Sequence, residues 1–530
     1  EMLEYWAENS IFEKSVTTRE GNKPFVFFEG PPSANGLPGV HHVLARAIKD
    51  IFPRYKTMKG FQVKRKAGWD THGLPIELGV EKELGITKED IGKTITVEEY
   101  NAACRKAVMR YTDIWNDLTQ KMGYWVNMDD PYITYEPKYM ESVWWLLKQV
   151  YEKNLMYKGY TIQPYSPKAG TGLSSHELNQ PGTYQDVTDT TVVAQFKAIK
   201  ETLPDFLQNE GDIYFLAWTT TPWTLPSNTA LTVGAKIDYV LVDTFNQYTF
   251  EPTKVILAKN LVGKQFGGKK NIQVEGVDKL NEYNSGDKKI PFHVVKEFKG
   301  QDLLEIRYEQ LLDYVLPHNN PQDAFRVIAG DFVTTEDGTG IVHTSPTFGA
   351  DDALVAKQAK PEIPPMLIKD ENDNLVPLVD LQGKFVKELG EFGGKYVKNE
   401  YYKEGEAPEK SIDVELAIKL KEENKAFKVE KYKHSYPNCW RTDKPILYYP
   451  LDSWFIKVTD VKERMHELNK TINWKPASTG EGRFGNWLAN ANDWNLSRSR
   501  YWGIPLPIWR TEDKKEEICI GSVAELKQEI

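Results

Sequence analysis

The sequence predicts an α/β protein in which an α/β domain is interrupted by a β-rich domain. Near the start, a strand-like run at residues 23–29 is followed by a Gly/Pro loop and a helical pattern at 43–58. Strand, glycine loop and helix in this order form a unit that can hold phosphates at the N-terminus of the helix. From about residue 186 to 394 the chain instead shows short β-branched runs separated by turn signals, which favours an inserted β-rich domain.

The remaining elements follow the same division. Helices are expected at residues 97–122 and 137–154, and a helical pattern returns at 414–424. Strands are expected in the β-rich part at residues 190–198, 213–220, 239–242, 254–258 and 325–333. The predicted parts are therefore residues 1–185, 186–394 and 395–530, with the first and third forming one domain.

Composition favours a folded protein of a reducing compartment. The chain has 530 residues, a net charge of −9 and 12% aromatic residues, which excludes a disordered chain. Three cysteines (Cys104, Cys439 and Cys519) are too few for a disulfide framework. No run approaches the ~18 apolar residues of a membrane span, and the first residues lack a signal pattern. We expect a cytoplasmic protein without membrane contact, whose first residue, Glu1, indicates a trimmed or partly ordered terminus.

Two glycine-containing loops carry the first candidate site. Residues 30–42 (GPPSANGLPGVHH) lead into a helix, where glycines allow close approach to a ligand and a histidine can donate to phosphate oxygens. Residues 68–77 (GWDTHGLPIE) place a carboxylate beside an aromatic ring, which suits an ammonium group. A structural turn and a helix cap remain the alternatives for these two loops.

Together with four later segments, these loops resemble the class I aminoacyl-tRNA synthetases, and within them the isoleucine-specific members. The later segments are AWTTTPWTLPSN (217–228), GTGIVHTSPTFGADD (338–352), HSYPNCWRTDKPILY (434–448) and NDWNLSRSRYWGIPLPIW (492–509). The resemblance implies a Rossmann-type parallel-sheet catalytic domain interrupted by a β-rich inserted editing domain. It implies ATP-dependent activation of isoleucine, transfer to tRNA(Ile) and hydrolytic editing of valyl-tRNA(Ile).

The resemblance also assigns roles at the synthetic site. Asp70 would hold the ammonium group of isoleucine, and Pro32 and Trp502 would wall its side chain. Residues 39–42 (Gly39, Val40, His41 and His42) would meet ATP, with Mg²⁺ on the phosphates. The expected partners are isoleucine and tRNA(Ile), and the expected state is a monomer.

The tetrapeptide departs from the family's pattern. Relatives carry His-x-Gly-His, whereas this chain has Gly39-Val40-His41-His42, so the first histidine and the glycine have exchanged places. We expect a rebuilt site with the same number of imidazoles; a site that has lost activation is the alternative. The family's Lys-Met-Ser-Lys-Ser loop does not occur before Ile530, and we therefore expect an N-terminal fragment with reduced synthetic activity.

A second site is expected in the inserted domain. One methylene gains only ~1–3 kcal/mol in an apolar pocket, a limit for which isoleucine-specific synthetases are the known example, so misactivated valine must be removed by hydrolysis. The resemblance assigns Asp352 to the substrate ammonium group and the hydroxyls and imidazole to placing water and the terminal ribose. The expected editing residues are Thr219, Thr220, Thr221, Asn228, His343 and Asp352.

No metal site is expected. His434 and Cys439 are two of the four ligands that zinc needs, and Thr442 stands where relatives carry another cysteine. The basic run at residues 54–66 is open to two interpretations, a solvated face or a tRNA contact.

Three functions stay open from the sequence: a proofreading ligase, a hydrolase of misacylated tRNA alone, and a catalytically silent binder. Dependence on ATP separates the first from the second, because hydrolysis of preformed valyl-tRNA needs none.

Overall fold

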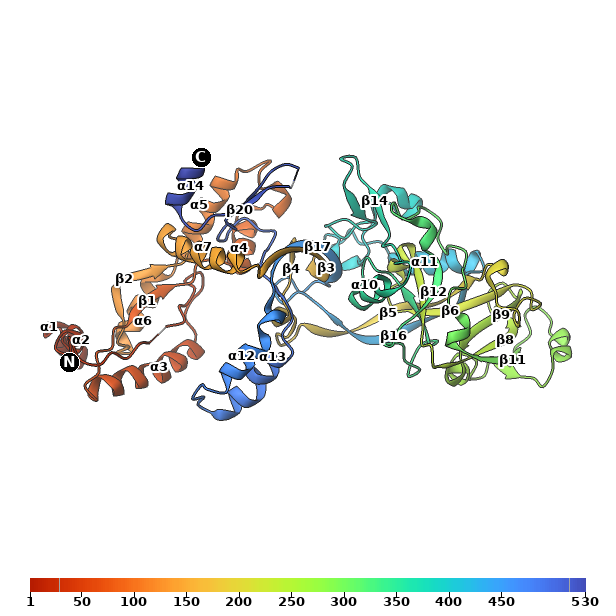
Figure 1. Cartoon of the computed structure of the whole chain (residues 1–530), viewed down its shortest axis with the longest axis horizontal. Helices are drawn as coiled ribbons and strands as arrows, with labels where there is room; N and C mark the ends of the chain where they lie inside the picture. The colour runs from red at the N-terminus through yellow and green to blue at the C-terminus, as the bar shows by residue number, and fades with distance from the viewer. Residues whose placement is uncertain (28, 514) are drawn as a thin grey trace. The chain divides into compact units, whose positions relative to one another are not determined.

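The computed structural model describes residues 1–27, 29–513 and 515–530, which form two compact units (Figure 1). Unit 1 comprises Glu1–Lys158 and Trp454–Ile530, and unit 2 comprises Gly159–Ser453. The chain crosses between the units within β3 (Met156–Ser166) and β17 (Leu447–Ile456). Among the described residues, no helix is both long and apolar enough to span a membrane.

Unit 1 contains the expected parallel strands. β1 (Lys66–Trp69) pairs in parallel with β2 (Asn127–Ile133), and Pro24 forms a parallel bridge with Gln62. Of the strand predicted at 23–29, only Pro24 forms a β-bridge, so the prediction is wrong for the other described residues of this run. The backbone hydrogen bonds of these described residues to a neighbouring segment are confined to Gln62, which accepts from Phe25 and donates to Lys23. Residue 28 lies outside the described residues. Helix α3 (Val40–Met58) follows the Gly/Pro loop, which confirms the predicted order of loop and helix.

Helices make up most of the rest of unit 1. The predicted helix at 97–122 is two helices, because residues 109–111 break the pattern. Before the crossing lie α1 (Met2–Glu8), α2 (Ile11–Thr17), α4 (Leu74–Leu84), α5 (Val97–Val108), α6 (Thr112–Lys121) and α7 (Pro137–Glu152). After it lie α12 (Lys462–Asn469), α13 (Gly485–Ala489), β18 (Trp494–Asn495), β19 (Ile508–Arg510), β20 (Glu517–Cys519) and α14 (Val523–Glu529).

Unit 2 is built on a ten-stranded mixed sheet, with both parallel and antiparallel strand pairs. The path runs β10-β11-β8-β9-β6-β13-β7-β12, and β5 joins β6 to β16. Its strands are β5 (Tyr184–Lys197), β6 (Ile213–Thr219), β7 (Ala230–Val233), β8 (Asp238–Phe245), β9 (Pro252–Ala258), β10 (Asn271–Gln273), β11 (Ile290–Lys299), β12 (Arg326–Ala329), β13 (Ile341–Thr344) and β16 (Ala426–Pro437). The predicted fold class, an α/β chain with parallel strands and a β-rich insertion, is confirmed.

Short elements complete unit 2. They are β4 (Thr171–Gly172), α8 (Ser175–Leu178), the 3₁₀ helix η3 (Pro222–Ser227), α9 (Val262–Gln265), α10 (Ala350–Gln358), β14 (Leu367–Lys369), β15 (Leu375–Pro377) and α11 (Ile412–Glu422). Unit 2 extends beyond residues 186–394 because β5 and β16 pair over their length, from Ala194↔Ala426 to Tyr184↔Pro437. Its core is aliphatic and aromatic, with Phe196 and Phe215 fully buried.

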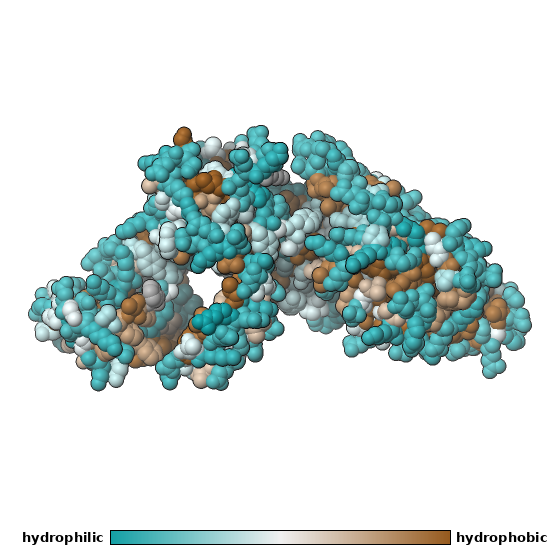
Figure 2. Space-filling model, in the orientation of Figure 1, coloured by the Kyte–Doolittle hydropathy of each residue, from teal (hydrophilic) through white to brown (hydrophobic). Residues whose placement is uncertain are grey.

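The surface is mostly hydrophilic, with apolar patches on the face shown in Figure 2. Helix α3 carries exposed apolar side chains spaced three or four residues apart, and this spacing places them in a stripe along one side of the helix. These side chains are Val40, Leu44, Ile48, Ile51, Tyr55 and Met58. A stripe of this kind marks a face suited to a further contact.

Candidate active site

A cavity of about 280 Å³ in unit 2 gathers five of the six residues predicted for editing. It lies where β6 ends, beside β13 and the start of α10, because Val342 of β13 pairs in parallel with Trp218 of β6. The lining residues are Trp218, Thr219, Thr220, Thr221, Thr224, Val342, His343, Ser345, Phe348, Gly349 and Asp352.

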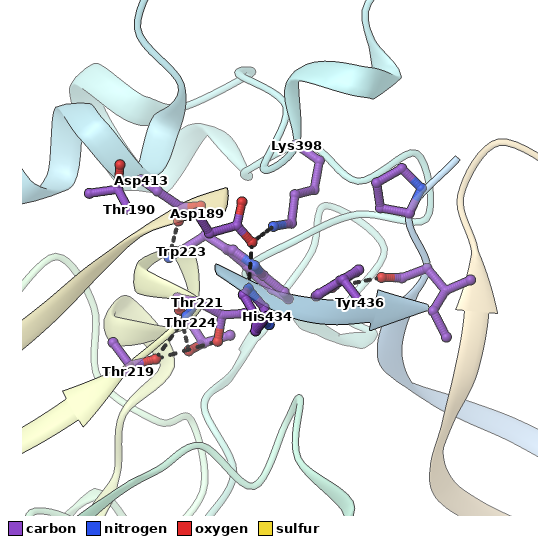
Figure 3. A network of polar contacts seen from close by, with 12 residues as sticks. Asp189, Thr190, Thr219, Thr221, Trp223, Thr224, Lys398, Asp413, His434 and Tyr436 are labelled. Atoms are coloured by element: carbon purple, nitrogen blue, oxygen red, sulfur yellow. Dashed lines mark hydrogen bonds and ion pairs between the residues drawn. The ribbon is translucent and has the colours of Figure 1, made fainter. Parts of the chain in front are cut away.

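Residues 219–224, the threonine loop, turn from β6 into η3. The Thr221 N–H donates to Thr219 Oγ1 at 3.1 Å, and the two hydroxyl oxygens lie 3.4 Å apart. Thr224 Oγ1 donates to the Thr221 carbonyl at 2.8 Å (Figure 3). Serine and threonine hydroxyls fold loops onto their own backbone in this way, so the loop presents several hydroxyl groups to the cavity.

The His343 ring is held in one tautomer by its neighbours. Tyr308 OH donates to Asn228 Oδ1 at 2.7 Å, so Asn228 Nδ2 is the donor to His343 Nδ1 at 2.8 Å. His343 Nε2 then carries the proton and donates to Thr224 Oγ1 at 3.0 Å. Burial lowers the pKa of His343 to about 3. The imidazole is therefore neutral and has both nitrogens engaged, which suits a wall that orients Thr224 rather than a general base.

Tyr308→Phe tests this arrangement. The variant leaves Asn228 Oδ1 buried without its donor, and an unsatisfied buried acceptor costs about 1–3 kcal/mol. We expect the free energy of unfolding of unit 2 to fall by about that amount in urea titrations. Tyr314→Phe, which removes an exposed hydroxyl from Glu391, is the matched control. Equal stability of the two variants would contradict the assignment.

Asp352 places a carboxylate in the cavity at the first turn of α10. Its Oδ2 accepts the Ser345 N–H at 2.7 Å. Burial raises the pKa of Asp352 to about 7, and nearby Asp351 adds to the rise while the Ser345 bond opposes it. A carboxylate so poorly solvated favours a cationic partner. A Cβ on Gly349 would lie 2.7 Å from the Asp352 carboxyl carbon, so glycine makes room for this side chain.

The structure also shows cavity residues that sequence reasoning missed, and one predicted residue that lies outside the cavity lining. Asn228 does not line the cavity but lies behind His343, 3% exposed. Thr224 and Phe348 line the cavity and were not predicted; Thr224 follows the threonine run by three residues, the spacing of one 3₁₀ turn. Ser345 also lines it, and its buried Oγ has no partner among the described residues.

The predicted substrate-binding residues of unit 1 lie near one another. The Asp70 N–H donates to the Pro32 carbonyl at 2.9 Å, and Trp502 Nε1 donates to the Thr71 carbonyl at 2.6 Å. Glu77 accepts the backbone N–H of Trp502 at 3.0 Å, which holds the Trp502 backbone. Burial raises the pKa of Asp70, and the N–H of His72 opposes the rise.

The permuted tetrapeptide forms the N-terminus of α3. His42 Nδ1 accepts the Gly39 N–H at 2.9 Å, and the His41 and His42 rings lie 3.8 Å apart between centroids. A Cβ on Gly39 would lie only 2.9 Å from His41 Cε1. The His41 ring therefore occupies the space that the glycine leaves free. Burial lowers the pKa of His42, and His41 and Arg46 lower it further.

The candidate zinc ligands and the basic run have partners within their own units. His434 Nε2 lies 3.1 Å from Asp189 Oδ2, and Cys439 is buried. No cluster of three or more His, Cys, Asp or Glu suited to a metal occurs in the part of the chain that the structure describes.

In the basic run at residues 54–66, Arg65 donates to Thr57 and Lys66 pairs with Asp130, so these two residues make contacts within unit 1.

Comparison with known proteins gives a consistent picture. Residues 1–530 match the family model described as tRNA synthetases class I (I, L, M and V). The isoleucine–tRNA ligase of Cytophaga hutchinsonii is 64% identical over 541 residues, and that of Bacteroides fragilis is 63% identical over 546. Each alignment covers 100% of this chain and 47% of the relative. The chain thus spans about half the length of the curated relatives it matches.

A solved complex of a leucyl-tRNA synthetase with tRNA from Agrobacterium radiobacter is also similar. It is 14% identical, with 99% of this chain and 52% of that chain covered, at a TM-score of 0.34.

Proposed function

Since the chain belongs to the class I tRNA synthetases of the I, L, M and V group, we propose that the whole protein is an isoleucine–tRNA ligase that edits its product. It activates isoleucine with ATP, transfers it to tRNA(Ile) and hydrolyses valyl-tRNA(Ile). The specificity for isoleucine is supported by the relatives of 63–64% identity. The division of labour is proposed to follow the predicted parts, with 1–185 and 395–530 catalytic and 186–394 editing.

The observation that carries the editing function is the convergence of Thr219, Thr220, Thr221, His343 and Asp352 on one cavity. Asp352 pairs with the ammonium group of the valyl ester, which in turn favours the ionised carboxyl. The loop hydroxyls bind the terminal ribose and the attacking water. That water adds to the ester carbonyl carbon, the bond to the ribose oxygen breaks, and the ribose oxygen takes a proton. Trp218 and Phe348 close the cavity around the amino-acid side chain.

The synthetic site is proposed around residues 39–42 and Asp70. The first turn of α3 presents backbone N–H groups and two imidazoles, which fit the phosphate oxygens of ATP. Mg²⁺ on the phosphates would neutralise their charge. Asp70 then orients the isoleucine ammonium group, and Trp502 lies within the same part of unit 1.

ATP–pyrophosphate exchange tests the ligase activity. The whole protein is assayed with isoleucine, valine, leucine and methionine. We expect isoleucine to support the fastest exchange and valine a slower one, because one methylene discriminates by ~1–3 kcal/mol. Absence of exchange with all four, in a protein that still deacylates valyl-tRNA(Ile), would identify an editing hydrolase and overturn the ligase assignment.

A further inference from the structure

A buried carboxylate outside the cavity lining holds the threonine loop. Asp413, in the first turn of α11, is 4% exposed and accepts the Trp223 N–H on Oδ1 at 2.9 Å (Figure 3). Pro222 has no N–H, and the Thr224 N–H donates to the Thr221 carbonyl at 3.0 Å. Asp413 therefore satisfies the remaining N–H in the first turn of η3, where a helix otherwise leaves donors unpaired.

Trp223 links this carboxylate to the cavity. Its buried ring packs edge to face against Phe348, with ring centroids 5.1 Å apart. Phe348 lines the cavity, as do Thr221 and Thr224 on either side of Trp223. A shift of the Trp223 backbone would consequently move two hydroxyls and one wall of the cavity together.

A second layer of charge supports Asp413. The Lys398 side chain is 7% exposed, and its Nζ lies 3.4 Å from Asp189 Oδ2, which also contacts His434 Nε2 at 3.1 Å. Burial alone would lower the pKa of Lys398, but Tyr436, Asp413 and Asp189 raise it above its usual range. Burial raises the pKa of Asp413 to about 7, and the Lys398 charge opposes that rise. The ammonium group thus favours the ionised form of Asp413, the stronger acceptor.

An arrangement of this kind is poorly explained by stability alone. Burying ions costs several kcal/mol each, and apolar replacements of buried ion pairs are often neutral or stabilising. We propose that Asp413, supported by Lys398, is a positioning residue for deacylation, which fixes the threonine loop through the Trp223 N–H. The inference rests on the proposed editing function.

The test compares Asp413→Ala with Asp413→Asn in the whole protein. Deacylation of valyl-tRNA(Ile) is measured as kcat and KM, urea unfolding reports on the folding of unit 2, and isoleucine-dependent pyrophosphate exchange reports on unit 1. Alanine removes the acceptor, so kcat falls at least about tenfold, the equivalent of one hydrogen bond, while KM stays within about twofold. Asparagine keeps an acceptor oxygen and retains kcat within about threefold. Asp380→Ala removes another carboxylate that accepts backbone N–H groups in unit 2, from Gln382 and Lys384, and lowers stability without changing kcat.

The outcomes separate the possibilities. An unchanged kcat in folded Asp413→Ala, or an asparagine variant as poor as the alanine one, overturns the inference. If Asp413→Ala does not fold, Lys398→Met decides, because it keeps most of the side-chain volume and removes the cation. A lower kcat in a variant whose unit 2 remains folded in urea titrations supports the inference, and an unchanged kcat overturns it. A wild-type protein without deacylase activity overturns the proposed function, and this inference with it.

Discussion

Asp352→Asn is expected to lower deacylation of valyl-tRNA(Ile) by about two orders of magnitude. The variant removes the only charge among the cavity-lining residues, and loss of a charged hydrogen bond in a poorly solvated site costs about 2–4 kcal/mol. Activation of isoleucine should be unchanged, so the whole protein should accumulate valyl-tRNA(Ile). The measurement is kcat/KM for deacylation, with pyrophosphate exchange alongside.

The matched control is Asp351→Asn, which changes the exposed neighbour on α10. It should leave deacylation within about twofold, because Asp351 is outside the cavity lining. Equal losses in the two variants would show that net charge near α10, rather than the Asp352 carboxylate, matters.

The same carboxylate predicts a pH dependence. Since the pKa of Asp352 is about 7, kcat/KM should fall as the pH drops below 7 and the carboxyl gains a proton. The pKa of Asp352 in the folded protein lies above the ordinary value of 3.8, so stability is lost as the pH rises between 3.8 and about 7. Asp352→Asn avoids this loss. Its free energy of unfolding at pH 8 should exceed that of the wild type by about 1–2 kcal/mol, a value that allows for the partial exposure of the Asp352 side chain. A less stable variant at pH 8 would contradict the origin of the shift.

Gly39→His is expected to reduce isoleucine-dependent pyrophosphate exchange by about a hundredfold, and His41→Gly in the same chain to restore most of it. The single change puts a Cβ 2.9 Å from His41 Cε1 and 3.0 Å from its Nδ1. Displacing the ring disturbs the first turn of α3, and misplacement by about 1 Å can cost about 10²-fold in rate. The double variant keeps two imidazoles and moves the free space to position 41.

His41→Gly alone is the control for the number of imidazoles. It leaves only His42 in the tetrapeptide and should stay less active than the double variant. Recovery in the double variant supports a rebuilt site, whereas exchange that is equally low in all three variants would contradict the mutual fit of Gly39 and His41.

Inhibitors that mimic isoleucyl-adenylate provide a further readout of the tetrapeptide. Because the His41 ring fills the space over Gly39, such inhibitors should bind the wild type less well than the double variant with the family's order. Equal inhibition constants for the two proteins would show that the exchange of positions does not affect binding of the adenylate.

Local patterns predict most of the strands and helices, but not the contacts behind the cavity. The strands of unit 2 are predictable because β-branched residues and turn signals alternate along the chain. Residues 219–221, 343 and 352 are predicted from the family resemblance of two short segments. The position of Asn228 behind His343 depends on Tyr308, 80 residues away, and the support from Asp413 depends on a helix 190 residues from Trp223. Such long-range pairings leave no periodic signal in the sequence.

The central claim is that the cavity of unit 2 hydrolyses valyl-tRNA(Ile). The most direct test incubates residues 1–530, without ATP, with preformed valyl-tRNA(Ile) or isoleucyl-tRNA(Ile). We expect hydrolysis of the valyl ester at least about tenfold faster than that of the isoleucyl ester, consistent with exclusion of the larger side chain. Equal rates for the two esters, or rates no faster than in buffer, would contradict the claim.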